Sequence, residues 1–202
     1  PLVRACENEI PVLPIYIIEP SFWKQPFSSK RHWSFIRDCL IDLQIDLINM
    51  RSNLHVEIDE AFNFFDEINK KFKICSILSH EETGNNWVLS RNTQVQNWCK
   101  TKNINFIEYP NNGVVRNLDN RDKWSQIKKN RLNLPILDKP NEINTLDYNF
   151  KFDLPSKNDF LFGTDEIFKV QKGGRKEALK IFDIFLKTNS DNYLKYISGP
   201  NN

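Results

Sequence analysis

Short apolar runs alternate along this chain with longer stretches in which apolar residues recur every three or four positions. Residues 12–18 and 74–78 are continuous apolar runs of strand length, typical of strands that are buried on both faces of a parallel sheet. Residues 54–58 and 104–107 are weaker candidates for further strands. Because helical stretches separate these runs, the sequence predicts an α/β fold with a doubly wound, mostly parallel sheet.

Three stretches between or after the strands have helical periodicity. The first, residues 29–51, carries an apolar stripe formed by Trp33, Ile36, Leu40, Leu43, Leu47 and Met50. The second carries Phe62, Phe65, Ile68 and Phe72, with Asp59 as the expected N-cap. The third, residues 87–102, is expected to bury Val88, Val95 and Trp98. Helices on both faces of the sheet would leave Ile15 and Ile77, in the middle of two strands, with no contact to solvent.

Composition excludes several classes of protein. With 40% apolar and 27% charged residues and a net charge of +2, the chain is ordinary for a globular domain. No apolar run approaches the roughly 18 residues that span a bilayer. Four scattered cysteines without a Cys-x-x-Cys pair indicate reduced thiols in a cytoplasmic protein, and the three histidines lack metal-ligand spacing, so no metal site is predicted. The glycine-rich phosphate-binding motifs of dinucleotide-binding domains and kinases are absent from the sequence.

A basic stretch surrounds Trp124. It consists of Arg116, Arg121, Lys123, Lys128, Lys129 and Arg131. Such a stretch could contact phosphates, although a solvated helix face has the same composition and neighbouring aspartates dilute the charge. Just before it, Gly113 is predicted to adopt a positive φ in a tight turn.

Four segments, in order along the chain, resemble one protein family. They are 13–20 (Leu-Pro-Ile-Tyr-Ile-Ile-Glu-Pro), 29–33 (Ser-Lys-Arg-His-Trp), 80–124, which opens with His-Glu-Glu-Thr-Gly-Asn-Asn-Trp, and 173–179 (Gly-Gly-Arg-Lys-Glu-Ala-Leu). They resemble the DNA photolyases and cryptochromes, which are light-driven flavoproteins. The resemblance covers nearly the whole chain.

The resemblance implies a domain organisation. Residues 1–131 would form the family's N-terminal α/β domain, 132–171 an interdomain connector, and 172–202 the incomplete start of the helical domain that binds FAD. It also implies a Rossmann-like sheet of order 3-2-1-4-5 whose central first strand is absent here, so the chain is expected to be a fragment cut at both ends. Since buried unpaired backbone groups cost about 1–3 kcal/mol each, the fragment is expected to be marginally stable.

Aromatic and polar side chains follow two of the predicted strands, where an open parallel sheet binds its ligands. Phe22 and Trp23 follow the strand at 12–18, and His80, Glu81 and Glu82 follow the strand at 74–78. The resemblance implies that these residues could hold an antenna chromophore, namely a folate, a deazaflavin or a flavin. Rings would stack on the planar chromophore and a carboxylate would accept its N–H groups. The alternative stays open that the carboxylates cap a helix and the rings pack a helix against the connector.

The function implied by the resemblance is that of a blue-light-dependent DNA photolyase, a carbon–carbon lyase that repairs UV-induced pyrimidine dimers. The full-length parent would be a cytoplasmic monomer that binds FAD and UV-damaged DNA and does not enter membranes. Its catalytic residues would lie beyond this chain, so none is assigned here. Two alternatives remain: a cryptochrome that signals in blue light without repair, and a nucleotide-binding α/β domain outside the family.

Overall fold

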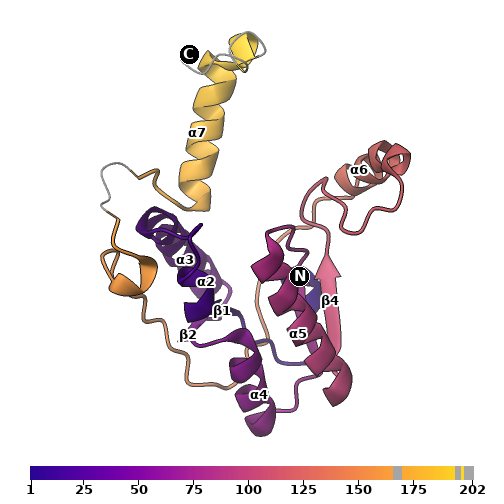
Figure 1. Cartoon of the computed structure of the whole chain (residues 1–202). Coiled ribbons are helices and arrows are strands. Elements are labelled where there is room, and N and C mark those ends of the chain that lie inside the picture. Colours follow the sequence, from indigo (N-terminus) through magenta and orange to yellow (C-terminus); the bar gives the residue numbers. More distant parts are fainter. Residues whose placement is uncertain (166–169, 194–196, 198–202) are drawn as a thin grey trace. The chain divides into compact units, whose positions relative to one another are not determined.

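The computed structural model describes residues 1–165, 170–193 and 197. Its elements, which Figure 1 traces in chain order, are α1 (Leu2–Ala5), β1 (Ile15–Ile18), α2 (Pro20–Trp23), α3 (Lys30–Asn49), β2 (His55–Ile58), α4 (Ala61–Lys71), β3 (Ser76–His80), α5 (Asn86–Lys102), β4 (Asn105–Tyr109), η1 (Arg121–Lys123), α6 (Trp124–Leu132), η2 (Phe160–Phe162), α7 (Arg175–Thr188) and η3 (Ser190–Asn192). All four strands predicted from the sequence are present, and helices separate them. Within the described part of the chain, no helix is long and apolar enough to cross a membrane.

The strands form two parallel pairs. β1 pairs with β2, with Ile15 opposite His55, and β3 pairs with β4, with Ser76 opposite Asn105. Among the described residues no hydrogen-bonded ladder joins β1 to β3. The predicted α/β class with parallel strands is therefore confirmed, and the pairs β1–β2 and β3–β4 are those that the expected order makes neighbours.

The chain divides into two compact units, residues 1–22 with 50–152 and residues 23–49 with 153–202. In the first unit, α4 and α5 pack against each other. Their shared core consists of Ala61, Val95, Trp98, Cys99 and Ile104, with Ile17, Phe65, Ile74, Ile77 and Phe106 packed against it. Because Ile17 belongs to β1 and Ile77 to β3, both strand pairs contribute to the same core.

The expectation that Ile15 and Ile77 are shielded from solvent is wrong, because both side chains are only partly buried. β3 contains no buried residue at all, and in β1 only Ile18 is buried. The physical reason is the pairing: each of these strands has a neighbour on one side only among the described residues. A strand at the edge of a sheet exposes more of its side chains than a central strand does.

Local residues cap α5, whereas the start of α4 depends on a distant residue. Asn85 caps α5 by accepting a hydrogen bond from the Val88 N–H at 3.2 Å, and Asn103 ends it in the left-handed region with φ 55°. The prediction that Asp59 caps α4 is wrong, because the N-cap residue is Glu60. The first N–H of α4, on Ala61, is instead satisfied by a distant carboxylate, that of Glu19, at 3.0 Å.

The predicted apolar stripes are confirmed in part. Val88, Val95 and Trp98 of α5 are buried as expected, whereas Leu43 of α3 and Phe62 of α4 are exposed. In α4 the buried aromatic residue is Phe64.

The connector after α6 lies against the first unit as far as residue 152. Ile143 donates a backbone hydrogen bond to Met50, and Lys151 accepts one from Val56 of β2 at 2.7 Å. The buried His55 also accepts a hydrogen bond at Nδ1 from the Lys151 N–H, at 3.1 Å. The connector thus forms hydrogen bonds with the Met50 carbonyl and with the Val56 N–H of β2.

In the second unit, two glycines bring the start of α7 onto α3. A Cβ at Gly173 would collide with the Phe35 carbonyl oxygen and lie 2.8 Å from Cys39 Sγ. The next glycine, Gly174, has φ 108°, which other residues rarely adopt. Asp42 of α3 then accepts a hydrogen bond from the first N–H of α7, on Arg175, at 2.7 Å.

The predicted positive φ at Gly113 is wrong. Among the described residues the glycines with positive φ are Gly163 and Gly174. The left-handed residue of the loop after β4 is Asn117, with φ 53°, since asparagine tolerates this conformation better than most residues.

Candidate functional site

The carboxyl ends of β1, β2 and β3 each lead directly into acidic residues of the first unit. Glu19 follows β1, Glu60 follows β2, and Glu81 and Glu82 follow β3. Ligands of open α/β sheets bind at this edge, so the partners of these carboxylates determine what the edge can do.

Glu19 is the most buried of these acids, at 6% exposure. Its Oε1 accepts the hydrogen bond from Ala61, and its Oε2 accepts one from Arg91 Nη1 of α5 at 2.9 Å. Burial raises the pKa of the Glu19 carboxyl, and this effect exceeds the lowering by Arg91 and by the Ala61 N–H. Glu19 thus connects the end of β1 to both α4 and α5.

Arg91 links Glu19 to two of the residues predicted for the site. Its Nη2 donates a hydrogen bond to Glu82 at 2.6 Å, and its guanidinium lies 5.7 Å from the centre of the Trp87 ring. Trp87 in turn contacts Phe22 edge to face, with ring centroids 5.1 Å apart. We call Phe22, Trp87, Arg91, Glu82 and Glu19 the carboxyl-edge cluster. It offers two aromatic rings, a guanidinium and a half-exposed carboxylate.

Glu81 belongs to a separate ion-pair network. Its carboxylate lies 3.0 Å from Arg131 and 4.0 Å from Arg116, and Arg116 also forms two hydrogen bonds with Glu108 of β4, at 3.0 and 2.6 Å. These bonds raise the pKa of the Arg116 guanidinium. Arg131 also donates to the Val114 carbonyl, at 2.7 Å. The network therefore ties the end of β3 to the basic stretch before and within α6.

The remaining two candidates lie in other surroundings. His80 is exposed at the end of β3, opposite Tyr109. Trp23 belongs to the second unit, where it is 4% exposed and packs edge to face against Trp33 and Phe162, at 5.7 and 4.8 Å. Trp33 and Phe162 stack at 4.2 Å. The structure thus joins Phe22 and Glu82 in one cluster, and finds Trp23 in an aromatic core.

Sequence reasoning did not assign Glu19, Trp87 or Arg91 to the site. The available signal was their position: Glu19 directly follows a strand, and Trp87 and Arg91 are four residues apart on one helix, so their side chains share a face.

The cluster fits a planar ligand only in part. Two rings and a guanidinium can contact a flat heterocycle, and the Arg91 Nε atom is buried without a hydrogen-bond partner in the described chain. Glu82 is already bonded to Arg91, so it has to share its oxygens with a ligand N–H group. As for metals, the described residues contain no group of three His, Cys, Asp or Glu side chains that could hold an ion.

Parallel strand pairs with helices between them, and polar residues gathered at their carboxyl ends, define a Rossmann-like α/β domain. The family model for DNA photolyase matches residues 1–126, and the chain therefore belongs to the DNA photolyase family. This membership confirms the resemblance and rules out a nucleotide-binding domain outside the family. No curated protein sequence matches the chain.

Solved structures of photolyases and a cryptochrome share the fold. The Synechocystis cryptochrome aligns over 96% of this chain with a TM-score of 0.73 and 16% identity. A class III photolyase from Agrobacterium tumefaciens aligns over 92%, with a TM-score of 0.69 and 15% identity. An archaeal photolyase from Sulfolobus tokodaii, solved with two FAD molecules, aligns over 89%, with a TM-score of 0.59 and 20% identity. The chain spans between 41% and 44% of the length of these proteins.

Proposed function

We propose that this chain is the light-harvesting domain of a DNA photolyase that repairs UV-induced pyrimidine dimers with blue light. The observation that carries the proposal is the carboxyl-edge cluster, in a chain of this family. Absorbed light would pass from an antenna chromophore at this cluster to an FAD bound by the remainder of the protein. The parent would act on DNA as a cytoplasmic monomer.

The antenna chromophore would be a folate, a deazaflavin or a flavin. A flavin gains some support from the Sulfolobus tokodaii photolyase, whose structure with two FAD molecules implies a novel light-harvesting cofactor. Phe22 and Trp87 would contact the ring system, while Glu82 would accept a ring N–H group. His80 and Glu81, which also follow β3, remain candidates for the rim of the same site.

Chromophore loading tests the antenna role. The 202-residue chain would be incubated separately with each of the three chromophore classes, desalted, and examined by absorbance. We expect one class to be retained, and retention to fall at least about tenfold in a Phe22→Ala, Glu82→Ala variant. Trp124→Ala is the matched control, because Trp124 is an exposed aromatic residue outside the cluster. Equal retention in all three proteins would place the chromophore elsewhere.

A repair assay separates photolyase from cryptochrome. The longer protein that contains this domain is expected to restore thymine-dimer oligonucleotides under blue light, whereas the 202-residue chain alone is expected neither to repair dimers nor to bind FAD as a catalytic cofactor. A longer protein that binds FAD and chromophore but leaves dimers intact would favour a signalling cryptochrome.

A further inference from the structure

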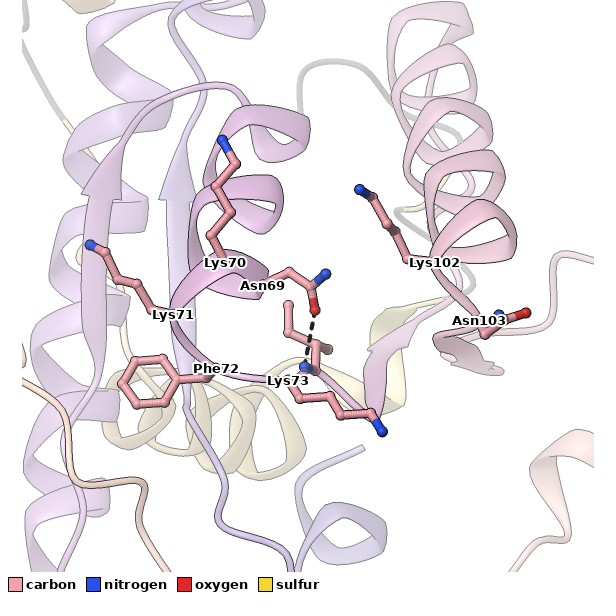
Figure 2. A pocket seen from close by; sticks show the side chains of 8 residues that line it. Asn69, Lys70, Lys71, Phe72, Lys73, Lys102 and Asn103 are labelled. Atoms are coloured by element: carbon pink, nitrogen blue, oxygen red, sulfur yellow. Dashed lines mark hydrogen bonds between the residues drawn. The ribbon is translucent and has the colours of Figure 1, made fainter.

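A hollow lined by lysines lies at the opposite edge of the strands from the carboxyl-edge cluster. It is formed where α4 and α5 end and where the chain enters β3 and β4, and its volume is about 530 Å³. Its lining residues are Asn69, Lys70, Lys71, Phe72, Lys73, Ile74, Lys102 and Asn103. In Figure 2, Lys70 and Lys102 extend from the facing sides of the two helices. We call this feature the lysine hollow.

Lysines near the C-terminal end of a helix need no ligand to explain them, because they complement the helix dipole. That explanation covers Lys70, Lys71 and Lys102, which lie in the last turns of α4 and α5. It does not cover Lys73, which follows α4. The carboxylates near the hollow pair with the other lysines. Asp66 lies 3.2 Å from Lys70 and 3.7 Å from Lys102, and Glu67 lies 2.6 Å from Lys70.

In Figure 2 the Lys71 side chain points away from α5, as Phe72 does, so the ammonium groups of the hollow are those of Lys70, Lys73 and Lys102. Lys73 has no carboxylate of the described chain within ion-pair distance. Its ammonium group is therefore available to an anion from solution.

The polar lining adds a neutral donor. Asn69 accepts the Ile74 N–H at Oδ1, at 3.1 Å, so its side-chain NH2 group is the end that remains for a ligand. This hydrogen bond also fixes the chain between α4 and β3. Ammonium and amide donors around one space are suited to an acceptor-rich anion.

The lining offers no ring for a base. Its aromatic residue, Phe72, points away from α5 in Figure 2 and contacts Tyr148, with ring centroids 5.9 Å apart. A nucleobase would have nothing to stack on, while the volume exceeds what a single phosphate fills. We propose that the lysine hollow binds a compact oligophosphate through its phosphate groups, with Lys73 and Lys102 as principal ligands.

Calorimetry with tripolyphosphate tests this proposal on the 202-residue chain. We expect saturable binding that weakens about tenfold or more in a Lys73→Gln, Lys102→Gln variant, because two charge-assisted contacts are lost. The matched control, Lys129→Gln with Lys180→Gln, removes the same charge outside the hollow and is expected to change the affinity less than about twofold. Melting curves verify that each variant is folded, and Lys73→Arg is expected to retain binding.

Binding of other ligands shows whether the hollow recognises phosphate groups alone, a nucleoside or a nucleic acid. ATP should bind like tripolyphosphate and adenosine should not bind, if phosphates alone are recognised. No binding of tripolyphosphate, or equal weakening in both double variants, would overturn the proposal. So would duplex DNA that binds through the same lysines when tripolyphosphate does not, since that result would mark a nucleic-acid surface. Chromophore loading of the Lys73→Gln, Lys102→Gln variant should be unchanged, so this test is independent of the antenna role.

Discussion

Arg91 of α5 donates a hydrogen bond from Nη1 to the buried carboxylate of Glu19, the residue directly after β1, at 2.9 Å. The Glu19 carboxylate is held in place from two sides, because Ala61 of α4 donates to its other oxygen. A single buried charge thus fixes one strand end to two helices, and the same arginine positions Glu82 for the proposed site.

Replacing Arg91 with methionine should destabilise the first unit by about 3 kcal/mol, because the Glu19 carboxylate would stay buried without its cation. Urea unfolding monitored by circular dichroism measures the change. A second substitution, Glu19→Gln, should recover part of the loss, since it removes the unpaired charge. Arg121→Met, which alters an exposed arginine, is the control. A loss no larger than that of the control would show that the pair contributes nothing.

Acid should destabilise the chain through His55. Its Nδ1 accepts the Lys151 N–H, so Nε2 carries the proton and faces Glu57 at 3.3 Å. Burial lowers the pKa of His55 below 6.5, although Glu57 partly opposes the shift. The unfolded chain therefore binds a proton more readily, and the stability that depends on neutral His55 is complete above pH 6.5 and declines as the pH falls from there toward the lower pKa of the folded state.

Unfolding in urea at about pH 7.5 and pH 5.5 checks this sign. The original chain should lose more stability between these two values than a His55→Gln variant does. His80→Gln serves as the control, because His80 is exposed. Parallel pH dependence in the original chain and in His55→Gln would contradict the account of His55.

Gly173→Ala should loosen α7 from α3. The added Cβ would collide with the Phe35 carbonyl oxygen and crowd Cys39, and a backbone atom within a helix cannot move away easily. We expect a destabilisation of about 1–3 kcal/mol, as for other overpacked sites. In Gly113→Ala the new Cβ would meet only the flexible Lys128 side chain, at 3.1 Å, so this control should be tolerated. Equal melting temperatures in the two variants would disprove the close packing.

The open edges of β1 and β3 predict a pattern of amide exchange. The ladder hydrogen bonds from His55 N to Pro14 O and from Asn105 N to Cys75 O fix which amides point toward the paired strand. By this register Ile17 and Leu78 direct their N–H groups to the unpaired side. Their amides should exchange faster than those of Tyr16 and Ser79 in hydrogen-exchange measurements. Equal protection would mean that these edges are paired in solution, by each other or by another strand.

Strand and helix positions followed from the sequence because they depend on local apolar periodicity. Details set by distant partners did not. The first N–H of α4 is satisfied by Glu19, 42 residues away, so the local rule that favoured Asp59 as cap failed. Likewise, the burial of Ile15 and Ile77 depends on neighbouring strands, which no local pattern reports. For the carboxyl-edge cluster, chain position after a strand indicated Phe22 and Glu82, but only the fold shows that Trp87 and Arg91 contact them.

We expect a planar chromophore to bind at the carboxyl-edge cluster, and a crystal structure of the chain loaded with its retained chromophore would reveal the binding site. Ligand density should lie against the rings of Phe22 and Trp87, with a ring N–H group within hydrogen-bond distance of Glu82. Density that leaves these three residues untouched, whether in the lysine hollow or elsewhere, would contradict this expectation.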